Sequence, residues 1–415
     1  MHMTEREKKV LDLINEKEVI EFAQALIRAK SDNPPGDTRE AAQVCMKKFE
    51  EYGIEAEVLT PPDSEVSILW PDTDNSKVQS VIATMKGSAG PTLVMNAHID
   101  TVRAGNLDEW KYDPFGAIIE DGYIYGRGAG DDKGAVLTQV LATCAIKKAG
   151  IPIKGTIKVN PVADEEANAC RGTHWLKKEG YLKPDILIIG EQTDNKIALG
   201  ERLPCQIKVH IKGKACHGAM PWNGVNATII AADFIQLVKE ELWPEAEKIK
   251  KPYFPPVTIS PTRIDGGIQT NIIPENCTLS LDCRLVPEMP LKYVISRFND
   301  LLQKLCDRGP AFEWSFSNDS ILDSDGIYTE PDSSLITTML DAVKEVTGEE
   351  TDPVCYMQGS DAEQFARFGI PIAIFGPSDP SVGHSPNERV SIQQLVEGTK
   401  ILAITILRLM GEEEE

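Results

Sequence analysis

The chain has 415 residues, a length that predicts two domains rather than one small core. Its apolar fraction of 41% is ordinary for a globular protein, and no run approaches the ~18 to 20 apolar residues of a membrane-spanning helix. Lys and Arg total 43 against 64 Asp and Glu, a net charge of −21. This balance argues against nucleic acid and anionic membranes as partners, because both bind basic surfaces.

The beginning of the chain and its cysteines bear on the cellular compartment. The opening MHMTEREKKV has no apolar segment of the kind that directs secretion. The nine cysteines are scattered, with no CxxC pair, and are interpreted as reduced core thiols. A cytoplasmic location is therefore expected.

The first part of the chain is predicted to be helical and then to alternate between strands and helices. Helices are expected over 18–28 and 37–52, on either side of the break Asn33-Pro34-Pro35-Gly36, and Asp37 with Glu40 indicates a capping box. The further elements of this part are strands over 55–59, 80–85, 92–96, 156–162 and 186–189, a hairpin over 118–125, and a helix with an apolar stripe over 134–148.

The character of the pattern changes after about residue 202. Strands and helices in the order βαββαβ between 206 and 317 are typical of a ferredoxin-like α+β domain. The α/β pattern then resumes with a helix over 334–346, a strand over 370–375 and a helix over 392–409. We therefore predict a mixed-sheet α/β/α domain formed by 1–202 and 319–415, interrupted by an inserted α+β domain at 203–318.

Six polar positions lie at the ends of predicted strands or in the loops that follow. They are His98 with Asp100, the pair Asp131-Asp132, the pair Glu165-Glu166, Glu191, His217 and His384. Each has an ordinary structural explanation on its own, such as a strand-end histidine or a solvated pair of acids. Their co-occurrence at the strand ends, where sites gather in open α/β sheets, indicates a functional site.

The residue types at these positions favour a metal site. Carboxylates that converge in one cleft repel one another unless cations or protons compensate them. Histidine with Asp and Glu, and no thiolate, suits a borderline divalent ion, zinc first, with cobalt or manganese as alternatives. The set contains one carboxylate more than a single ion would need. This surplus indicates two ions that share a bridging ligand, as in two-metal hydrolases.

The glycine-rich stretch Gly126–Gly134 does not fit a nucleotide-binding loop. It lacks the Gly-Lys-Ser/Thr ending of a phosphate-binding loop, and two acids stand where a phosphate would bind. It is better interpreted as a tight turn that presents a carboxylate.

In these residues and their order, the chain resembles the dinuclear-zinc aminoacylase and exopeptidase family of acetylornithine deacetylase, succinyl-diaminopimelate desuccinylase, carnosinase and carboxypeptidase G. The resemblance runs from about Pro34 to Leu409, nearly the whole chain. The segments that carry it are His98-Ile-Asp-Thr-Val, Gly126-Arg-Gly-Ala-Gly-Asp131-Asp-Lys-Gly134, Asp164-Glu165-Glu166, Gly190-Glu191-Gln-Thr, Gly213-Lys-Ala-Cys-His217, Asn271-Ile-Ile-Pro274 with Asp282-Cys-Arg284, and Gly376-Pro377 with His384-Ser-Pro-Asn-Glu388.

The resemblance implies a role for each strand-end residue. Asp131 would bridge two metal ions, with a cis peptide bond to Asp132. His98 and Glu191 would complete one metal site, and Glu166 and His384 the other. Asp100 would accept the far N–H of His98 and orient its ring, and Glu165 would be the general base.

The resemblance also implies that the insertion is a lid and dimerisation domain. His217 would reach the active site of the partner subunit and steady the oxyanion, and Asn271 and Arg284 would hold the substrate. A homodimer is therefore expected.

Two enzymatic functions stay open at this stage. The first is a deacylase that removes the acyl group of an N-acyl amino acid, and the second is a metallo-exopeptidase, either a carboxypeptidase or a dipeptidase, with the same mechanism. A metal-binding protein without turnover is a distant third. The chain departs from the family pattern at Ala97, where glycine is common, and at Gln192, where proline is usual. A third departure bears on the substrate: Glu363 stands in place of an arginine that could bind an acidic side chain, which weakens the case for a succinylated or acidic substrate.

Overall fold

The computed structural model describes residues 3–67, 69–318 and 326–412. The chain divides into two compact units. The α/β unit comprises Met1–Gly200, Thr329–Tyr356 and Ser360–Glu415, and the inserted unit comprises Glu201–Tyr328 with Met357–Gly359. The predicted junction between 202 and 203 lies close to the first of these borders. The predicted junction between 318 and 319 adjoins residues 319–325, which lie outside the described part of the chain.

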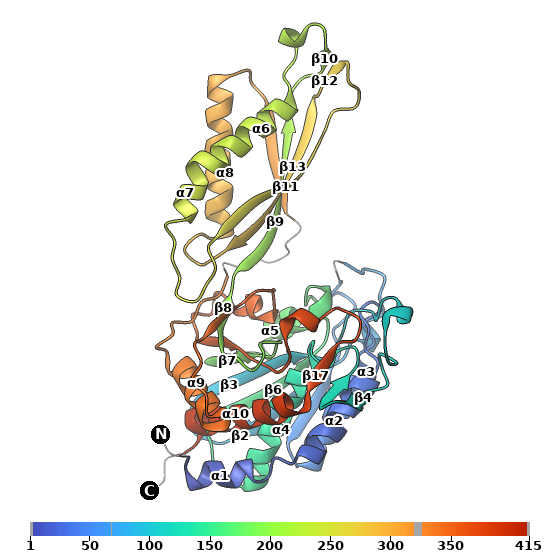
Figure 1. Cartoon of the computed structure of the whole chain (residues 1–415), viewed down its shortest axis with the longest axis vertical. Helices are drawn as coiled ribbons and strands as arrows, with labels where there is room; N and C mark the ends of the chain where they lie inside the picture. The colour runs from blue at the N-terminus through green and yellow to red at the C-terminus, as the bar shows by residue number, and fades with distance from the viewer. Residues whose placement is uncertain (1–2, 68, 319–325, 413–415) are drawn as a thin grey trace. The chain divides into compact units, whose positions relative to one another are not determined.

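The α/β unit is built on an eight-stranded mixed sheet in the order β1-β2-β6-β3-β7-β16-β8-β15. Figure 1 labels five of these strands, β2, β6, β3, β7 and β8. The strands β3, β6, β7 and β16 are parallel to their neighbours in this core, whereas β1, β2 and β8 pair antiparallel. Their bounds are β1 Glu55–Leu59, β2 Ser80–Lys86, β3 Ser88–His98, β6 Lys154–Val162, β7 Ile186–Ile189, β8 Ala198–Glu201, β15 Val354–Tyr356 and β16 Ile372–Ile374. The mixed α/β class predicted from the sequence is confirmed.

Several helices cover this sheet, and α4 (Lys133–Ala149) is the most deeply buried of them. It packs on β3 and β6, and α2 (Glu16–Arg28), α3 (Arg39–Glu51) and α10 (Ile392–Met410) pack on it (Figure 1). Because α4 lies between the sheet and a second layer of helices, it is buried almost all round, so its buried surface is wider than the predicted apolar stripe. The other helices are α1 Glu5–Leu11, α5 Thr173–Lys178 and α9 Ser334–Thr347.

The predicted hairpin is present as β4 (Ile118–Glu120) and β5 (Tyr123–Tyr125), and β17 (Arg389–Ser391) adds a third strand to it. The predicted capping box at Asp37 is wrong. Thr38 precedes α3 without a side-chain cap, and its hydroxyl donates instead to the carbonyl of Gln79. The carboxylate of Asp37 forms an ion pair of 2.7 Å with Arg39 in place of the predicted capping hydrogen bond.

A half-buried contact between α2 and the end of α3 has a measurable pH dependence. Burial would raise the pKa of Glu18, but hydrogen bonds from Lys48 and Tyr52 outweigh it and hold that pKa below its usual range. A depressed pKa stabilises the fold above the unfolded-state pKa of about 4.3, and this stabilisation is lost as the pH falls through the folded pKa. We expect Glu18→Gln to lower the free energy of unfolding at pH 7 by about 1 kcal/mol and to have little effect at pH 3, measured by denaturant titration. An equal loss at both pH values would contradict the electrostatic origin.

The inserted unit has a four-stranded antiparallel sheet in the order β11-β13-β9-β14, with α6 and α8 packed together on it. In chain order its elements are β9 Leu203–Lys212, α6 Ala227–Leu237, β11 Thr258–Gly266, β13 Asn276–Leu285, α8 Leu291–Arg308 and β14 Glu313–Asn318. This is the predicted βαββαβ order of a ferredoxin-like domain. A short helix α7 (Trp243–Ala246) follows α6, and β10 (Cys216–His217) pairs with β12 (Ile272–Ile273) in a separate two-stranded sheet.

Among the described residues, no helix is long and apolar enough to cross a membrane.

Candidate metal centre

The carboxyl ends of the neighbouring strands β6, β3 and β7 bring polar residues from distant parts of the chain together. His98 is the last residue of β3 and stands opposite Val162, the last residue of β6. Glu165 and Glu166 follow β6 in a short 3-10 helix, and Glu191 follows β7. Since these strands are parallel and end at one edge, their following loops converge there.

Asp131 lies at the centre of the resulting cluster. Its Oδ1 is 2.9 Å from Nε2 of His98, and its Oδ2 is 3.2 Å from Nε2 of His384. The same His384 nitrogen is 3.1 Å from Oε1 of Glu166. Ligand atoms of His98, Asp131 and Glu166 all lie within 4.8 Å of one another.

These spacings suit divalent metal ions. Two ligand atoms bound to one tetrahedral ion with bonds of about 2.0 to 2.1 Å are roughly 3.3 Å apart, close to the distances found here. Imidazole nitrogens and carboxylate oxygens without a thiolate are the donors that zinc and similar ions accept. The two oxygens of Asp131 face two different histidines, which is the arrangement that a bridging carboxylate requires.

The ring of His98 is oriented through Asp100, although by a different atom from the one expected. Nδ1 of His98 is 2.9 Å from the backbone carbonyl oxygen of Asp100, whereas the nearest oxygen of the Asp100 carboxylate is 3.7 Å away. The carboxylate is committed elsewhere, because it accepts the backbone N–H groups of Glu165 and Glu166, each at 3.3 Å. Asp100 thus contacts both the metal-facing histidine and the Glu165-Glu166 segment.

The electrostatics of the cluster are those of buried acids held close together. Burial, with the negative charge of neighbouring carboxylates, raises the pKa of Glu165 and of Glu191 well above the usual range. Hydrogen bonds to Asp131 and Glu166 raise the pKa of His384 to about 10. Divalent cations at this position would offset the repulsion between the carboxylates and favour their charged forms.

Glu191 has a buried partner that the sequence interpretation missed. The Tyr356 hydroxyl, at the end of β15, donates to Oε2 of Glu191 at 2.8 Å. Glu191 is not among the three residues whose ligand atoms lie within 4.8 Å of one another, but the negative charges of Asp132 and Asp131 contribute to its raised pKa. No local pattern around Tyr356 indicates this contact, which depends on the sheet placing β15 beside β8.

Glu388 supports the segment that carries Asp131. Its Oε1 accepts the backbone N–H groups of Gly130 and Asp131, each at 2.9 Å, and its Oε2 is 2.5 Å from the guanidinium of Arg127. The peptide bond between Asp131 and Asp132 is cis, as expected. Glu388 is the last residue of the motif His384-Ser-Pro-Asn-Glu388. The motif singles this glutamate out, but its hydrogen bonds to the Asp131 segment are visible only in the structure.

His217, Asn271 and Arg284 all belong to the inserted unit. His217 in β10 is exposed, and its Nδ1 accepts the N–H of Ala219 at 3.0 Å. Asn271 directly precedes β12, and its backbone oxygen accepts the N–H of Gly218. Asn271 and His217 therefore lie at neighbouring positions of the two strands β12 and β10. Arg284 in β13 is paired with Asp282 at 3.0 Å, and any substrate carboxylate would compete with this contact.

Comparison with known proteins identifies the family. The model of peptidase family M20/M25/M40 matches residues 94–408. An uncharacterized metallohydrolase of Methanocaldococcus jannaschii is 28% identical, covering 94% of this chain and 98% of its own. A probable succinyl-diaminopimelate desuccinylase of Staphylococcus aureus is 26% identical, with 91% and 93% covered. Among solved structures, the aminopeptidase PepT of Bacillus cereus has a TM-score of 0.74 at 21% identity, with 95% and 99% covered.

The matched segment spans most of the chain and includes every residue of the strand-end cluster. The resemblance seen in the sequence motifs is therefore confirmed. The chain belongs to peptidase family M20/M25/M40 and is a metal-dependent hydrolase of amide bonds.

Proposed function

We propose that this hydrolase removes the acyl group from N-acyl amino acids with the help of two divalent metal ions, zinc before cobalt or manganese. The observation that carries the proposal is the position of Asp131, whose two carboxylate oxygens face His98 and His384 separately. Asp131 would bridge the ions, with His98 and Glu191 on one side and Glu166 and His384 on the other. Bound ions would activate a water molecule and polarise the scissile carbonyl.

Proton transfer from the attacking water to the leaving amine would be carried out by a side chain of the protein. Glu165 lies beside the cluster, with Oε2 4.0 Å from Nε2 of His98, and is well placed to act as general base. It would take a proton from the attacking water and return it to the nitrogen of the leaving amine.

Recognition of the substrate would involve the inserted unit. Asn271 and the guanidinium of Arg284 are proposed to hold the α-carboxylate, and the exposed His217 is proposed to steady the oxyanion in the active site of a partner subunit. The enzyme would thus be a homodimer, and a cytoplasmic location stays a prediction. Glu363 in place of an arginine leads us to expect N-succinyl substrates to be poorer than N-acetyl ones.

A metallo-exopeptidase is the second candidate, favoured by the family's description as peptidases. A hydrolysis screen of N-acetyl, N-formyl and N-succinyl amino acids beside dipeptides, with zinc or cobalt added, separates the two. Turnover of the acyl amino acids above that of every dipeptide supports the deacylase. Turnover confined to dipeptides would replace it with the exopeptidase, and no metal-dependent turnover of either class would contradict both.

The role of His217 across a dimer can be tested by complementation. Homodimers of His217→Ala and of Glu165→Gln are each expected to be inactive, because one lacks the oxyanion contact and the other the base. A mixture that forms heterodimers contains one site with both residues intact, so about a quarter to a half of wild-type activity per heterodimer should return if the contact crosses subunits. Heterodimers without activity, verified by differently tagged subunits, would contradict the role in trans.

A further inference from the structure

A single buried amide joins two of the loops that form the metal centre. Asn33 is 4% exposed, and its Nδ2 donates to Oδ2 of Asp100 at 2.9 Å and to Oδ1 of Asp164 at 3.2 Å. Asp100 follows β3, and Asp164 follows β6 directly before Glu165. The two hydrogens of one NH₂ group can thus bridge two carboxylates that are themselves buried.

The orientation of this amide follows from the charges around it. With the amide flipped, its oxygen would face two carboxylates, which is repulsive. In the orientation present, Oδ1 is buried and has no hydrogen-bond partner among the described residues. The side chain therefore gives up one hydrogen bond in order to bind both acids.

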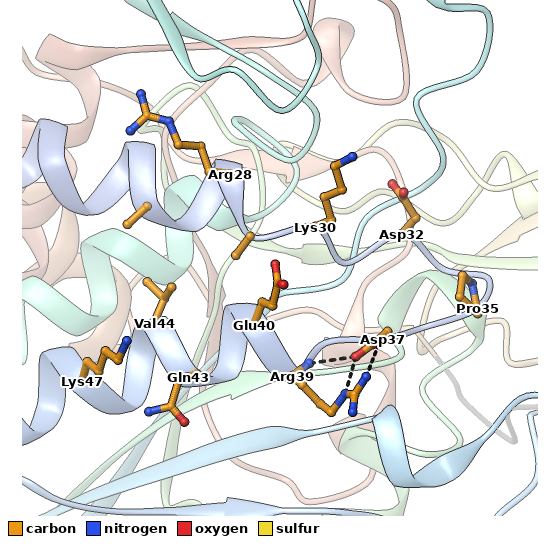
Figure 2. A pocket seen from close by; sticks show the side chains of 12 residues that line it. Arg28, Lys30, Asp32, Pro35, Asp37, Arg39, Glu40, Gln43, Val44 and Lys47 are labelled. Atoms are coloured by element: carbon orange, nitrogen blue, oxygen red, sulfur yellow. Dashed lines mark hydrogen bonds and ion pairs between the residues drawn. The ribbon is translucent and has the colours of Figure 1, made fainter.

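The backbone around Asn33 is fixed as firmly as its side chain. The N–H of Asn33 donates to the carbonyl of Thr101 at 2.7 Å, and the N–H of Thr101 donates to the carbonyl of Ser31 at 3.1 Å. The neighbouring residues Asp32 and Pro35 line an open groove of about 800 Å³ between α2 and α3 (Figure 2). Asn33 is not among the residues that line this groove.

The contacts of Asp100 connect Asn33 to the catalytic segment. The carboxylate of Asp100 accepts the N–H groups of Glu165 and Glu166, so a shift of this carboxylate would move the backbone of both residues. The same Oδ1 of Asp164 also accepts from the buried guanidinium of Arg171, at 2.5 Å, and its Oδ2 accepts the backbone N–H of Arg171 at 2.9 Å. Without the amide of Asn33, two buried carboxylates would face each other with one fewer donor between them.

We infer that Asn33 is a positioning residue that acts through Asp100 and Asp164 to hold Glu165 and Glu166 in place for metal binding and hydrolysis. The inference rests on the proposed function for the roles of Glu165 and Glu166. It assigns Asn33 no contact with the substrate. Loss of its amide should therefore change kcat and metal affinity while leaving KM nearly unchanged.

The test compares Asn33→Ala and Asn33→Asp with Asn195→Ala, using the metal-free full chain reloaded with zinc. Asn195 is the control because it is also a buried amide whose Oδ1 has no partner among the described residues, and its Nδ2 donates to the carbonyl of Gln394 and not to a carboxylate. Because Asn195 has a φ of 55°, where alanine is strained, zinc affinity and kcat are compared for the folded fraction of each variant. Both Asn33 variants are expected to weaken zinc binding by about 10- to 100-fold, as outer contacts to metal ligands typically do, and to lower kcat by at least tenfold with KM within threefold. The control should keep the zinc affinity and kcat of the wild type.

The outcomes separate this inference from the proposed function. Zinc affinity and kcat within twofold of the wild type in Asn33→Ala would overturn the inference, and so would an equal loss in Asn195→Ala. If Asn33→Asp does not fold, the alanine variant alone decides, since it adds no third carboxylate. A wild-type chain that binds no zinc would instead refute the proposed function, independently of any variant.

Discussion

Glu165→Gln is expected to lower kcat by about 10²- to 10⁴-fold while both metal ions stay bound. Glutamine keeps the shape of the side chain but cannot accept the proton of the attacking water. Because Glu165 is held through its backbone N–H by Asp100, the substitution should leave the surrounding cluster in place. Steady-state kinetics on the best substrate of the screen, together with metal content by mass spectrometry, measure the two effects separately.

An exposed glutamate provides the control for this substitution. Glu57 in β1 lies at the far edge of the sheet, and Glu57→Gln should retain the kcat of the wild type. A Glu165→Gln enzyme that keeps more than a tenth of wild-type kcat would remove Glu165 from the mechanism. A variant that loses activity and metal together would show that the residue serves metal binding instead.

Removal of metal is expected to abolish hydrolysis and to lower the melting temperature. The cluster places Asp131 and Glu166 around His384, and without cations the buried carboxylates repel one another. Ions that bind only the folded state stabilise it by about 2.7 kcal/mol at a free concentration 100 times the Kd. Dialysis against a chelator, followed by titration with zinc or cobalt, should restore activity and melting temperature together and saturate near two ions per chain.

Dialysis against the same chelator already saturated with zinc controls for direct effects of the chelator. Asp131→Ala is expected to bind fewer ions than the wild type at saturation, because the bridging oxygens are gone. Less than one ion per wild-type chain after zinc loading would refute the two-metal proposal. Two ions bound by Asp131→Ala would refute the bridging role while leaving the metal centre itself intact.

The long elements of the fold were predictable because their apolar patterns are local. The parallel strands β6 and β7, the helices α2 and α10, and the βαββαβ order of the inserted unit all follow from hydrophobic periodicity. The strands β8, β15 and β17 were missed, since each has only three or four residues and no periodicity of its own. Their pairing is determined by neighbours far away in the chain.

The candidate site shows the same division between local and distant information. His98, Asp131, Glu166 and His384 were found because each lies in a motif that follows a strand, and the fold places them in one cluster. The contacts of Tyr356 with Glu191 and of Asn33 with Asp100 join residues separated by 165 and 67 positions. Such contacts exist only in the folded chain, so a sequence interpretation based on motifs could not assign them.

The place of β16 in the sheet has a consequence for biosynthesis. β16 lies between β7 and β8, although the whole inserted unit is translated before it. In a nascent chain that has not reached Ile372, the edge of β7 that later pairs with β16 is therefore unpaired, and unpaired strand edges are prone to aggregation. The same unfinished chain also lacks His384, so the contacts of this histidine with Asp131 and Glu166 form only after the inserted unit has been made.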